Sequence, residues 1–232
     1  LLLDGAVDRQ RLSVIPNGID PDRVPSGGGD GVRDELGIPP RAPLVAVIGR
    51  LVPDKRHAMA LEAFALLRES LPTARMVVAG AGGLEERLRV MSRELGLAES
   101  VIFAGHREDV PAVLDAAQAL LVSSSREGMP HVILEAMVAG TPVVATRVAG
   151  IPEMIEDENH GLLIPPGSAA AAAEGLRRVL ENRELGRELA TRAGQRVRQE
   201  FRLSEMTDRF EDLFSRLIAG RGPRVAADAE QR

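Results

Sequence analysis

The sequence predicts an α/β domain, in which about six parallel strands form a sheet with helices on both faces. Short apolar runs such as LVAVI and RMVVA alternate with longer segments of helical spacing. These runs lack polar alternation, as expected for strands that are buried on both faces. Strands separated by helices favour a parallel sheet with right-handed crossovers, a Rossmann-like arrangement.

The first part of the chain carries little of this pattern. Leu12, Val14 and Ile15 favour a short strand, after which PNG marks a turn. We expect residues 1–24 to be an interdomain segment containing this strand. Residues 25–42, which begin with PSGGGDG, are expected to be a flexible loop with one helical turn at residues 32–36.

Strands and helices alternate over residues 43–200, which we expect to form the Rossmann-like domain. The expected strands are residues 44–48, 75–79, 101–104, 119–122 and 162–164, with another before the loop at 147–150. The expected helices are residues 56–70, 84–95, 110–117, 151–155 and 169–180, one that starts at Pro130, and one with Leu185, Leu189 and Val197 on one face. A last helix at 201–219, capped by Ser204, precedes a disordered tail at 220–232.

The composition excludes several functions. The chain has no Cys, so it has no disulfide or thiolate metal site. A net charge of −5, with no Trp or Tyr, argues against nucleic acid as a partner. The four histidines lack metal-ligand spacing and no Asp-x-Asp pair is present, so we expect neither a metal nor another cofactor.

The first ten residues, LLLDGAVDRQ, contain no basic segment typical of a signal peptide. They also lack an initiator Met, so we expect the chain to be cut from inside a longer one. No apolar run reaches the roughly 18 residues of a membrane span. We expect a cytoplasmic location, with peripheral membrane contact through the full-length enzyme as an alternative.

Ligands of such sheets bind beyond the carboxyl ends of the strands, near the point where the strand order reverses. In the loop GRLVPDK, Gly49 lets the backbone approach a ligand, and Arg50 and Lys55 offer two cations suited to a diphosphate. The alternative is an ordinary solvated loop. The sequence leaves the two readings about even.

A second candidate loop is EGMP, which precedes a helix. Pro130 fits the first helical position, so the backbone N–H groups of Gly128, Met129, His131 and Val132 are expected to form an anion site. Glu135, one turn later, can accept hydrogen bonds from two vicinal hydroxyls such as those of a ribose. As an alternative, Glu135 is an ordinary surface residue. Gly80, Gly82 and Gly83 can also approach a phosphate, but a tight turn explains them better.

Six motifs in this order resemble the C-terminal half of retaining GT-B glycosyltransferases of the family 4 type. They are GRLVPDK, AGAGG, VIFAGH, EGMPHVILEAMVAGTPVVAT, RVAGIPEMIED and GLLIPPG. The segment RLSVIPNGID is similar to the link between the two domains of those enzymes. The resemblance covers residues 14–166 and implies a metal-independent donor-binding domain.

The resemblance also implies roles for single residues. Arg50 and Lys55 match cations that bind the donor diphosphate and stabilise it as it leaves. In the E-x7-E motif, Glu127 matches the glutamate that contacts the donor sugar and Glu135 the one that binds the ribose. Gly128 and Met129 match the loop that approaches sugar and phosphate. His106 and Arg107 match the region that borders the base.

Three positions depart from the family pattern. Arg56 stands where Gly is common, Ala81 where an acidic residue is common, and Gly83 where Pro is common. These departures affect the details of the phosphate contacts rather than the class of the protein.

The resemblance implies that the acceptor domain, with its catalytic-site histidine, belongs to an N-terminal half that this chain lacks. The last helix commonly packs on that domain. We therefore expect Met206, Phe210 and Phe214 to be partly exposed, or the helix to fold back or to associate with another chain.

The expected function is hexosyl transfer from a UDP- or GDP-linked sugar to an acceptor hydroxyl, with little or no activity in the isolated chain. A sugar-nucleotide epimerase of the same architecture and a non-catalytic nucleotide-binding module are the alternatives. The base, the sugar, the acceptor and the oligomeric state are not apparent from the sequence.

Overall fold

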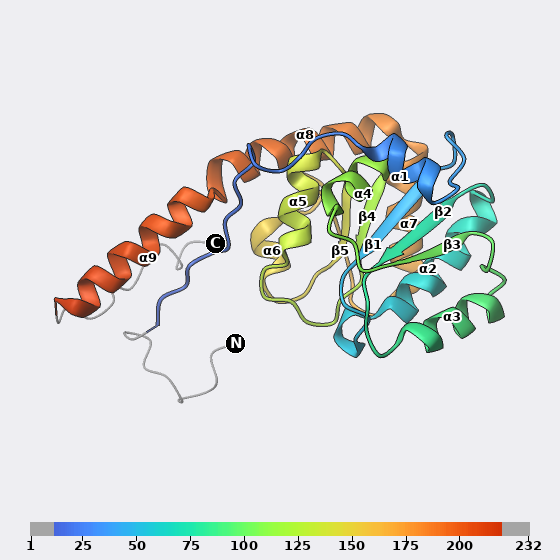
Figure 1. Cartoon of the computed structure of the whole chain (residues 1–232), viewed down its shortest axis with the longest axis horizontal. Helices are drawn as coiled ribbons and strands as arrows, with labels where there is room; N and C mark the ends of the chain where they lie inside the picture. The colour runs from blue at the N-terminus through green and yellow to red at the C-terminus, as the bar shows by residue number, and fades with distance from the viewer. Residues whose placement is uncertain (1–11, 220–232) are drawn as a thin grey trace.

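The computed structural model describes residues 12–219 (Figure 1). The strands of its sheet are β1 (Leu44–Ile48), β2 (Arg75–Ala79), β3 (Val101–Gly105), β4 (Ala119–Val122), β5 (Val143–Thr146) and β6 (Leu162–Ile164). The α-helices are α1 (Gly29–Glu35), α2 (His57–Ser70), α3 (Glu85–Glu94), α4 (Val110–Ala116), α5 (His131–Ala139), α6 (Ile151–Met154), α7 (Ala169–Glu181), α8 (Arg183–Glu200) and α9 (Leu203–Ile218). A short 3-10 turn, η2 (Pro53–Lys55), precedes α2.

All the strand pairs are parallel, and the strand order is β3-β2-β1-β4-β5-β6. The chain proceeds from β1 outward to β3, then returns across the sheet to β4 on the other side of β1. The order therefore reverses between β1 and β4. The predicted fold class is confirmed, because six parallel strands lie between helices on both faces.

Alternate residues of β1 face opposite sides of the sheet, and each side has its own apolar core. Val45 and Val47 belong to the core covered by α2, α3 and α7. Leu44 and Ala46 belong to the core covered by α1, α4, α5, α6 and α8. This double burial explains why the strands read as continuous apolar runs.

Two expectations for the start of the chain are wrong. No strand forms at residues 12–15; the segment is extended, and its one bridge joins Ile19 to Arg202 at the start of α9. The expected flexible loop at 25–42 contains helix α1, which begins at Gly29 rather than at Val32. Buried Arg33 stabilises this helix against the domain by binding the carbonyls of Pro39, Ala42 and Ala116.

Helix α9 extends away from the sheet, and the segment before α1 runs beside its first turns (Figure 1). It begins at Leu203 with Arg202 at the N-cap, so the expectation that Ser204 caps it is wrong. Phe210 and Phe214 are exposed, as expected, and their rings stack with centroids 6.1 Å apart. The tail expected at 220–232 lies outside the described residues.

Candidate functional site

The loops after β1 and β4 meet at the reversal of the strand order. Residues 49–55 follow β1 and residues 123–130 follow β4, and these two strands are neighbours. Two hydrogen bonds join the loops: Ser125 N–H donates to the Asp54 carbonyl at 2.8 Å, and the Ser123 hydroxyl donates to the Lys55 carbonyl at 2.7 Å. The fold thus places the two candidate loops side by side, where open α/β sheets bind ligands.

Lys55 and Glu127 form an ion pair between these loops, through Lys55 Nζ and Glu127 Oε1. The Ser124 hydroxyl donates a second hydrogen bond, of 2.7 Å, to the same carboxylate oxygen. The side chains of Lys55 and Glu127 are 23% and 11% exposed. Ser124 was not among the predicted site residues, although the run of three serines at the end of a buried strand was a usable signal.

Arg50 is exposed and makes no side-chain hydrogen bond or ion pair within the described part of the chain. It lies on the same loop as Lys55, directly after Gly49. One cation of the predicted pair is therefore neutralised locally, and the other is available to an anion.

Helix α5 begins one residue later than expected. Pro130 is extended and occupies the N-cap, and His131 is the first helical residue. Within the described residues, no backbone acceptor pairs with the N–H groups of Met129, His131 or Val132. Unpaired N–H groups at a helix start are suited to an anion, because the helix dipole adds to them.

Glu135 lies on the second turn of α5 and is partly buried. Burial raises the pKa of its carboxyl group, and His131, one turn earlier, acts in the opposite direction. No described side chain bonds to this carboxylate. A partly buried acceptor without a partner is suited to hydroxyl donors of a ligand.

Two glycines let the loops above the sheet approach each other closely. A Cβ at Gly80 would lie 2.0 Å from the Gly49 carbonyl oxygen, and one at Gly150 would lie 1.8 Å from the Gly128 oxygen. Both distances are shorter than any side chain permits. The suggestion of a phosphate contact at Gly80 remains a prediction, but its closeness to Gly49 is sufficient to explain the glycine.

Asn17, in the predicted interdomain segment, contacts the second loop directly. Its side-chain Nδ2 donates to the Met129 carbonyl at 2.8 Å, and its backbone N–H donates to Met129 Sδ at 3.0 Å. The next residue, Gly18, donates its N–H to Met206 Sδ at the start of α9. Sequence reasoning missed this role, because Asn17 and Met129 lie 112 residues apart and no local pattern connects them.

The residues predicted to border the base follow β3. His106 is exposed, whereas Arg107 binds the carboxylates of Asp109 and Glu35. Asp109 and then Glu35 raise the pKa of the Arg107 guanidinium. The Arg107 side chain thus joins the loop after β3 to the end of α1, and a contact with a base remains a prediction.

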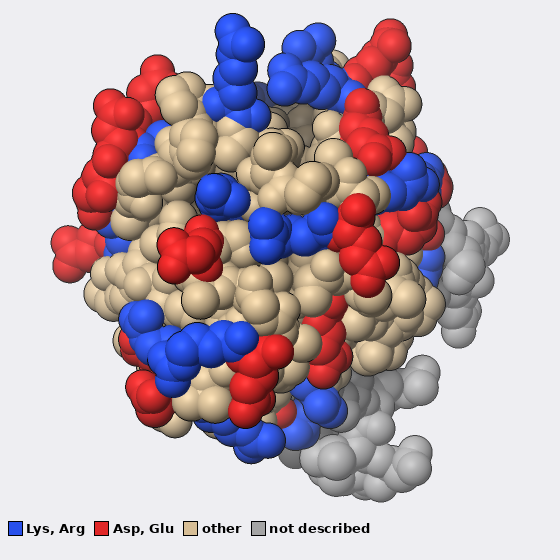
Figure 2. Space-filling view, turned by 90° about the vertical axis from the view of Figure 1, so that its right-hand side faces the viewer, with Lys and Arg blue, Asp and Glu red and all other residues tan. Residues whose placement is uncertain are grey.

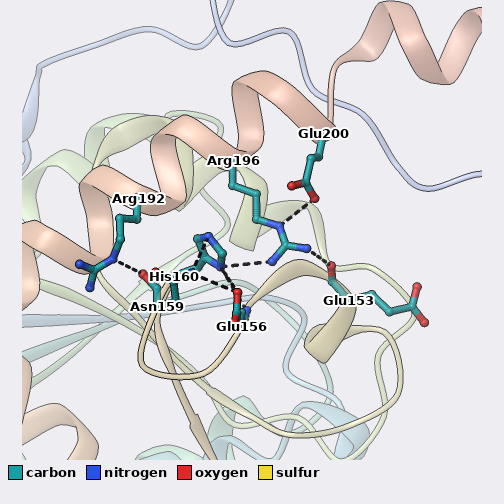
Figure 3. Close-up of polar contacts among 7 residues, drawn as sticks. All are labelled: Glu153, Glu156, Asn159, His160, Arg192, Arg196 and Glu200. Atoms are coloured by element: carbon teal, nitrogen blue, oxygen red, sulfur yellow. Dashed lines mark hydrogen bonds and ion pairs between the residues drawn. The ribbon is translucent and has the colours of Figure 1, made fainter. Parts of the chain in front are cut away.

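The segment after α6 is fastened to α8 by a polar cluster (Figure 3). Arg192 donates to the Asn159 carbonyl at 2.8 Å, and Arg196 donates to the Glu153 carbonyl at 3.1 Å. Arg196 also lies 3.2 Å from His160 Nδ1. Burial and then Arg196 lower the pKa of His160. The cluster anchors the end of the loop that brings Gly150 to the site.

Within residues 12–219, no group of three or more His, Cys, Asp or Glu side chains could hold a metal ion. None of the helices in this range is long and apolar enough to cross a membrane.

Comparison with known proteins gives consistent matches. Residues 30–199 match the family described as glycosyl transferases group 1. The chain is 34% identical over 229 residues to a D-inositol 3-phosphate glycosyltransferase of Saccharomonospora viridis, covering 94% of this chain and 52% of that protein. It is 31% identical over 183 residues to the lipopolysaccharide core biosynthesis glycosyltransferase LpsE of Rhizobium meliloti, covering 79% of this chain and 53% of that one.

A solved structure agrees with these relatives. The crystal structure of Anabaena Alr3699/HepE in complex with UDP-glucose superposes with a TM-score of 0.81 at 26% identity, covering 88% of this chain and 57% of that chain. The chain spans about half the length of the curated relatives that it matches. On the match over residues 30–199, the chain belongs to the glycosyl transferases group 1 family.

Proposed function

We propose that this chain is the donor-binding, C-terminal domain of a retaining glycosyltransferase of the family 4 type. The observation that carries the proposal is the meeting of Lys55 and Glu127 at the reversal of the strand order, with Glu135 on the helix that follows. A cation, a sugar-facing carboxylate and a ribose-facing carboxylate are the three groups that a nucleotide diphosphate sugar requires. We propose UDP as the nucleotide, because the Anabaena structure that this fold resembles holds UDP-glucose.

In the proposed reaction, the acceptor oxygen bonds to the anomeric carbon of a hexosyl group as the bond to the diphosphate oxygen breaks on the same face of the sugar. Negative charge grows on the diphosphate. Arg50, exposed and unpaired, and Lys55 would stabilise that charge, as preorganised cations do. Glu127 would hold hydroxyl groups of the transferred sugar.

The reaction also needs an acceptor and the exclusion of water, which a second domain closing over the site would supply. We propose that the partner is an N-terminal acceptor domain that packs on the apolar face of α9. Phe214 is 56% exposed and Leu217 is 53% exposed. The isolated chain would therefore bind the donor weakly and turn it over little or not at all.

Calorimetry with UDP, UDP-glucose and GDP tests the donor site. We expect UDP to bind this chain, and Glu135→Ala to weaken binding by about tenfold or more, because hydrogen bonds to a charged group contribute about 1.5–3 kcal/mol. Glu94→Ala, at an exposed residue on α3, is the matched control. Equal UDP affinity in Glu135→Ala and in the unmodified chain would exclude the ribose role.

The proposed partner has a separate test. Phe210→Ser with Phe214→Ser should leave the unfolding free energy of the isolated chain nearly unchanged, because both side chains are exposed. In the full-length enzyme the same pair should lower kcat/KM. Full activity of that double variant would contradict the packing of α9 on the acceptor domain without affecting the donor site.

A further inference from the structure

A second concave site lies at the opposite end of the sheet from the proposed donor site. It has a volume of about 410 Å³ and is lined by the segments that enter β1, β4 and β5, the end of α7 and the start of α8. We call it the basal pocket. Its volume is within the range of small-molecule sites, roughly 300–1,000 Å³. Figure 2 shows a hollow at the upper edge of the face it draws, with Lys or Arg side chains beside it.

Three arginines line the basal pocket from two sides, and no Asp or Glu lines it. Arg41 belongs to the segment before β1, whereas Arg183 and Arg187 lie one turn apart on α8 and so leave the same face of that helix. Arg183 is the first residue of α8, where the positive end of the helix dipole adds to the charge.

None of these three guanidinium groups forms a hydrogen bond or ion pair with another described residue. The arginines nearby on α7 differ: Arg177 is paired with Glu174 and Glu181, and Arg178 is paired with Glu158. The arginines of the pocket are thus uncompensated, in a chain whose net charge is −5.

We propose that the basal pocket binds a soluble phosphate ester. The planar guanidinium group matches the geometry of phosphate oxygens, and three such groups suit a dianion. The floor of the pocket is apolar, with Pro43, Pro142 and Val179 among its residues. A bare phosphate would leave this floor uncovered, whereas an ester presents an organic part to it. The site does not depend on the proposed function, because none of its residues belongs to the loops after β1 and β4.

Amide-resolved NMR titration with phenyl phosphate and with inorganic phosphate tests the proposal. We expect phenyl phosphate to produce saturable shifts at Gly140 and Gly186, which line the pocket, and to bind more tightly than inorganic phosphate. Arg183→Gln with Arg187→Gln should weaken phenyl phosphate binding by about tenfold or more, as the loss of charge-assisted hydrogen bonds implies.

The matched control removes two charges elsewhere. Arg87→Gln with Arg93→Gln changes two exposed arginines of α3 and should leave the affinity unchanged at constant ionic strength. Shifts confined to the loops at 49–55 and 127–132, or an equal loss of affinity in the two double variants, would overturn the proposal.

A lipid headgroup also carries phosphate, so sedimentation with phosphatidylglycerol vesicles separates the two sources. We expect no sedimentation beyond that of the Arg183→Gln, Arg187→Gln variant, because a soluble ester enters a concave site that a bilayer surface does not. Vesicle binding that requires these two arginines, in the absence of phenyl phosphate binding, would also overturn the proposal.

Discussion

Lys55 and Glu127, 72 residues apart in the chain, form an ion pair across the point where the strand order of the sheet reverses. Lys55 ends the loop after β1, and Glu127 lies on the loop after β4. Because both side chains are mostly buried, the pair is less screened than a surface ion pair. An anion that approaches Lys55 therefore meets a lysine that already has a carboxylate partner.

This relationship predicts an unusual effect of Glu127→Gln on nucleotide binding. The neutral amide no longer opposes a diphosphate near Lys55, and a gain of about 1 kcal/mol corresponds to roughly fivefold tighter UDP binding. If Glu127 also holds the donor sugar, UDP-glucose should gain less than UDP. Calorimetric affinities of the two ligands measure both effects.

Glu174→Gln, which removes a carboxylate paired with Arg177 on α7, controls for the change in net charge. It should leave both affinities unchanged. Weaker UDP binding in Glu127→Gln than in the unmodified chain would show that Lys55 is not a ligand of the diphosphate.

Asn17→Ala should loosen the second loop of the site. Without the hydrogen bond from Nδ2 to the Met129 carbonyl, we expect a loss of about 1 kcal/mol in unfolding free energy. UDP affinity should also fall, because the loop that carries Glu127 and Met129 loses its anchor to the interdomain segment. Urea unfolding and calorimetry report the two effects separately.

Asn182→Ala is the matched control for this prediction. Asn182 caps α8 by accepting from the Leu185 N–H at 3.1 Å, so its loss should also cost about 1 kcal/mol. It lies at the opposite end of the sheet, and UDP affinity should stay the same. Similar losses of UDP affinity in both variants would mean that Asn17 acts only through global stability.

The strands and the main helices were predictable because each is bounded by Pro, Gly or polar turn residues and reads as one period. The order of the strands was not, since crossovers pack by shape and leave no local pattern. Helix α1 was missed as a complete helix for a related reason. Its stability depends on Arg33 and carbonyls such as that of Ala116, 83 residues away.

The candidate site shows the same division. Arg50, Lys55, Glu127 and Glu135 could be singled out, because cations and carboxylates stand on loops that leave strand ends. The pairing of Lys55 with Glu127 and the contact of Asn17 with Met129 follow from the tertiary fold alone.

Arg56 adopts a left-handed backbone conformation, with φ 53° and ψ 38°, just before α2. That conformation costs a non-glycine residue roughly 1–2 kcal/mol, and glycine loses part of the benefit through its greater freedom in the unfolded chain. Arg56→Gly should therefore raise the unfolding free energy by about 1 kcal/mol. Arg56 is exposed, so little packing is lost. Arg56→Ala keeps the strain, and equal stability of the two variants in urea would refute the strain argument.

His57, the first residue of α2, should make stability depend on pH. Its side chain is 3% exposed, and neither ring nitrogen has a hydrogen-bond partner in the described structure. Burial, and then the charge of Lys55, lower the pKa of His57 from 6.5 to about 4. The unfolded chain therefore binds a proton below pH 6.5 that the folded chain takes up only near pH 4.

The contribution of neutral His57 to stability is complete above pH 6.5 and declines as the pH falls toward 4, by roughly 3 kcal/mol in all. His57→Leu should remove this decline, so the difference in unfolding free energy between pH 7 and pH 4 should shrink by about that amount. His106→Leu, at an exposed site, should leave the difference unchanged. Urea unfolding at several pH values measures it, and parallel pH profiles for His57→Leu and the unmodified chain would show that His57 is protonated equally in both states.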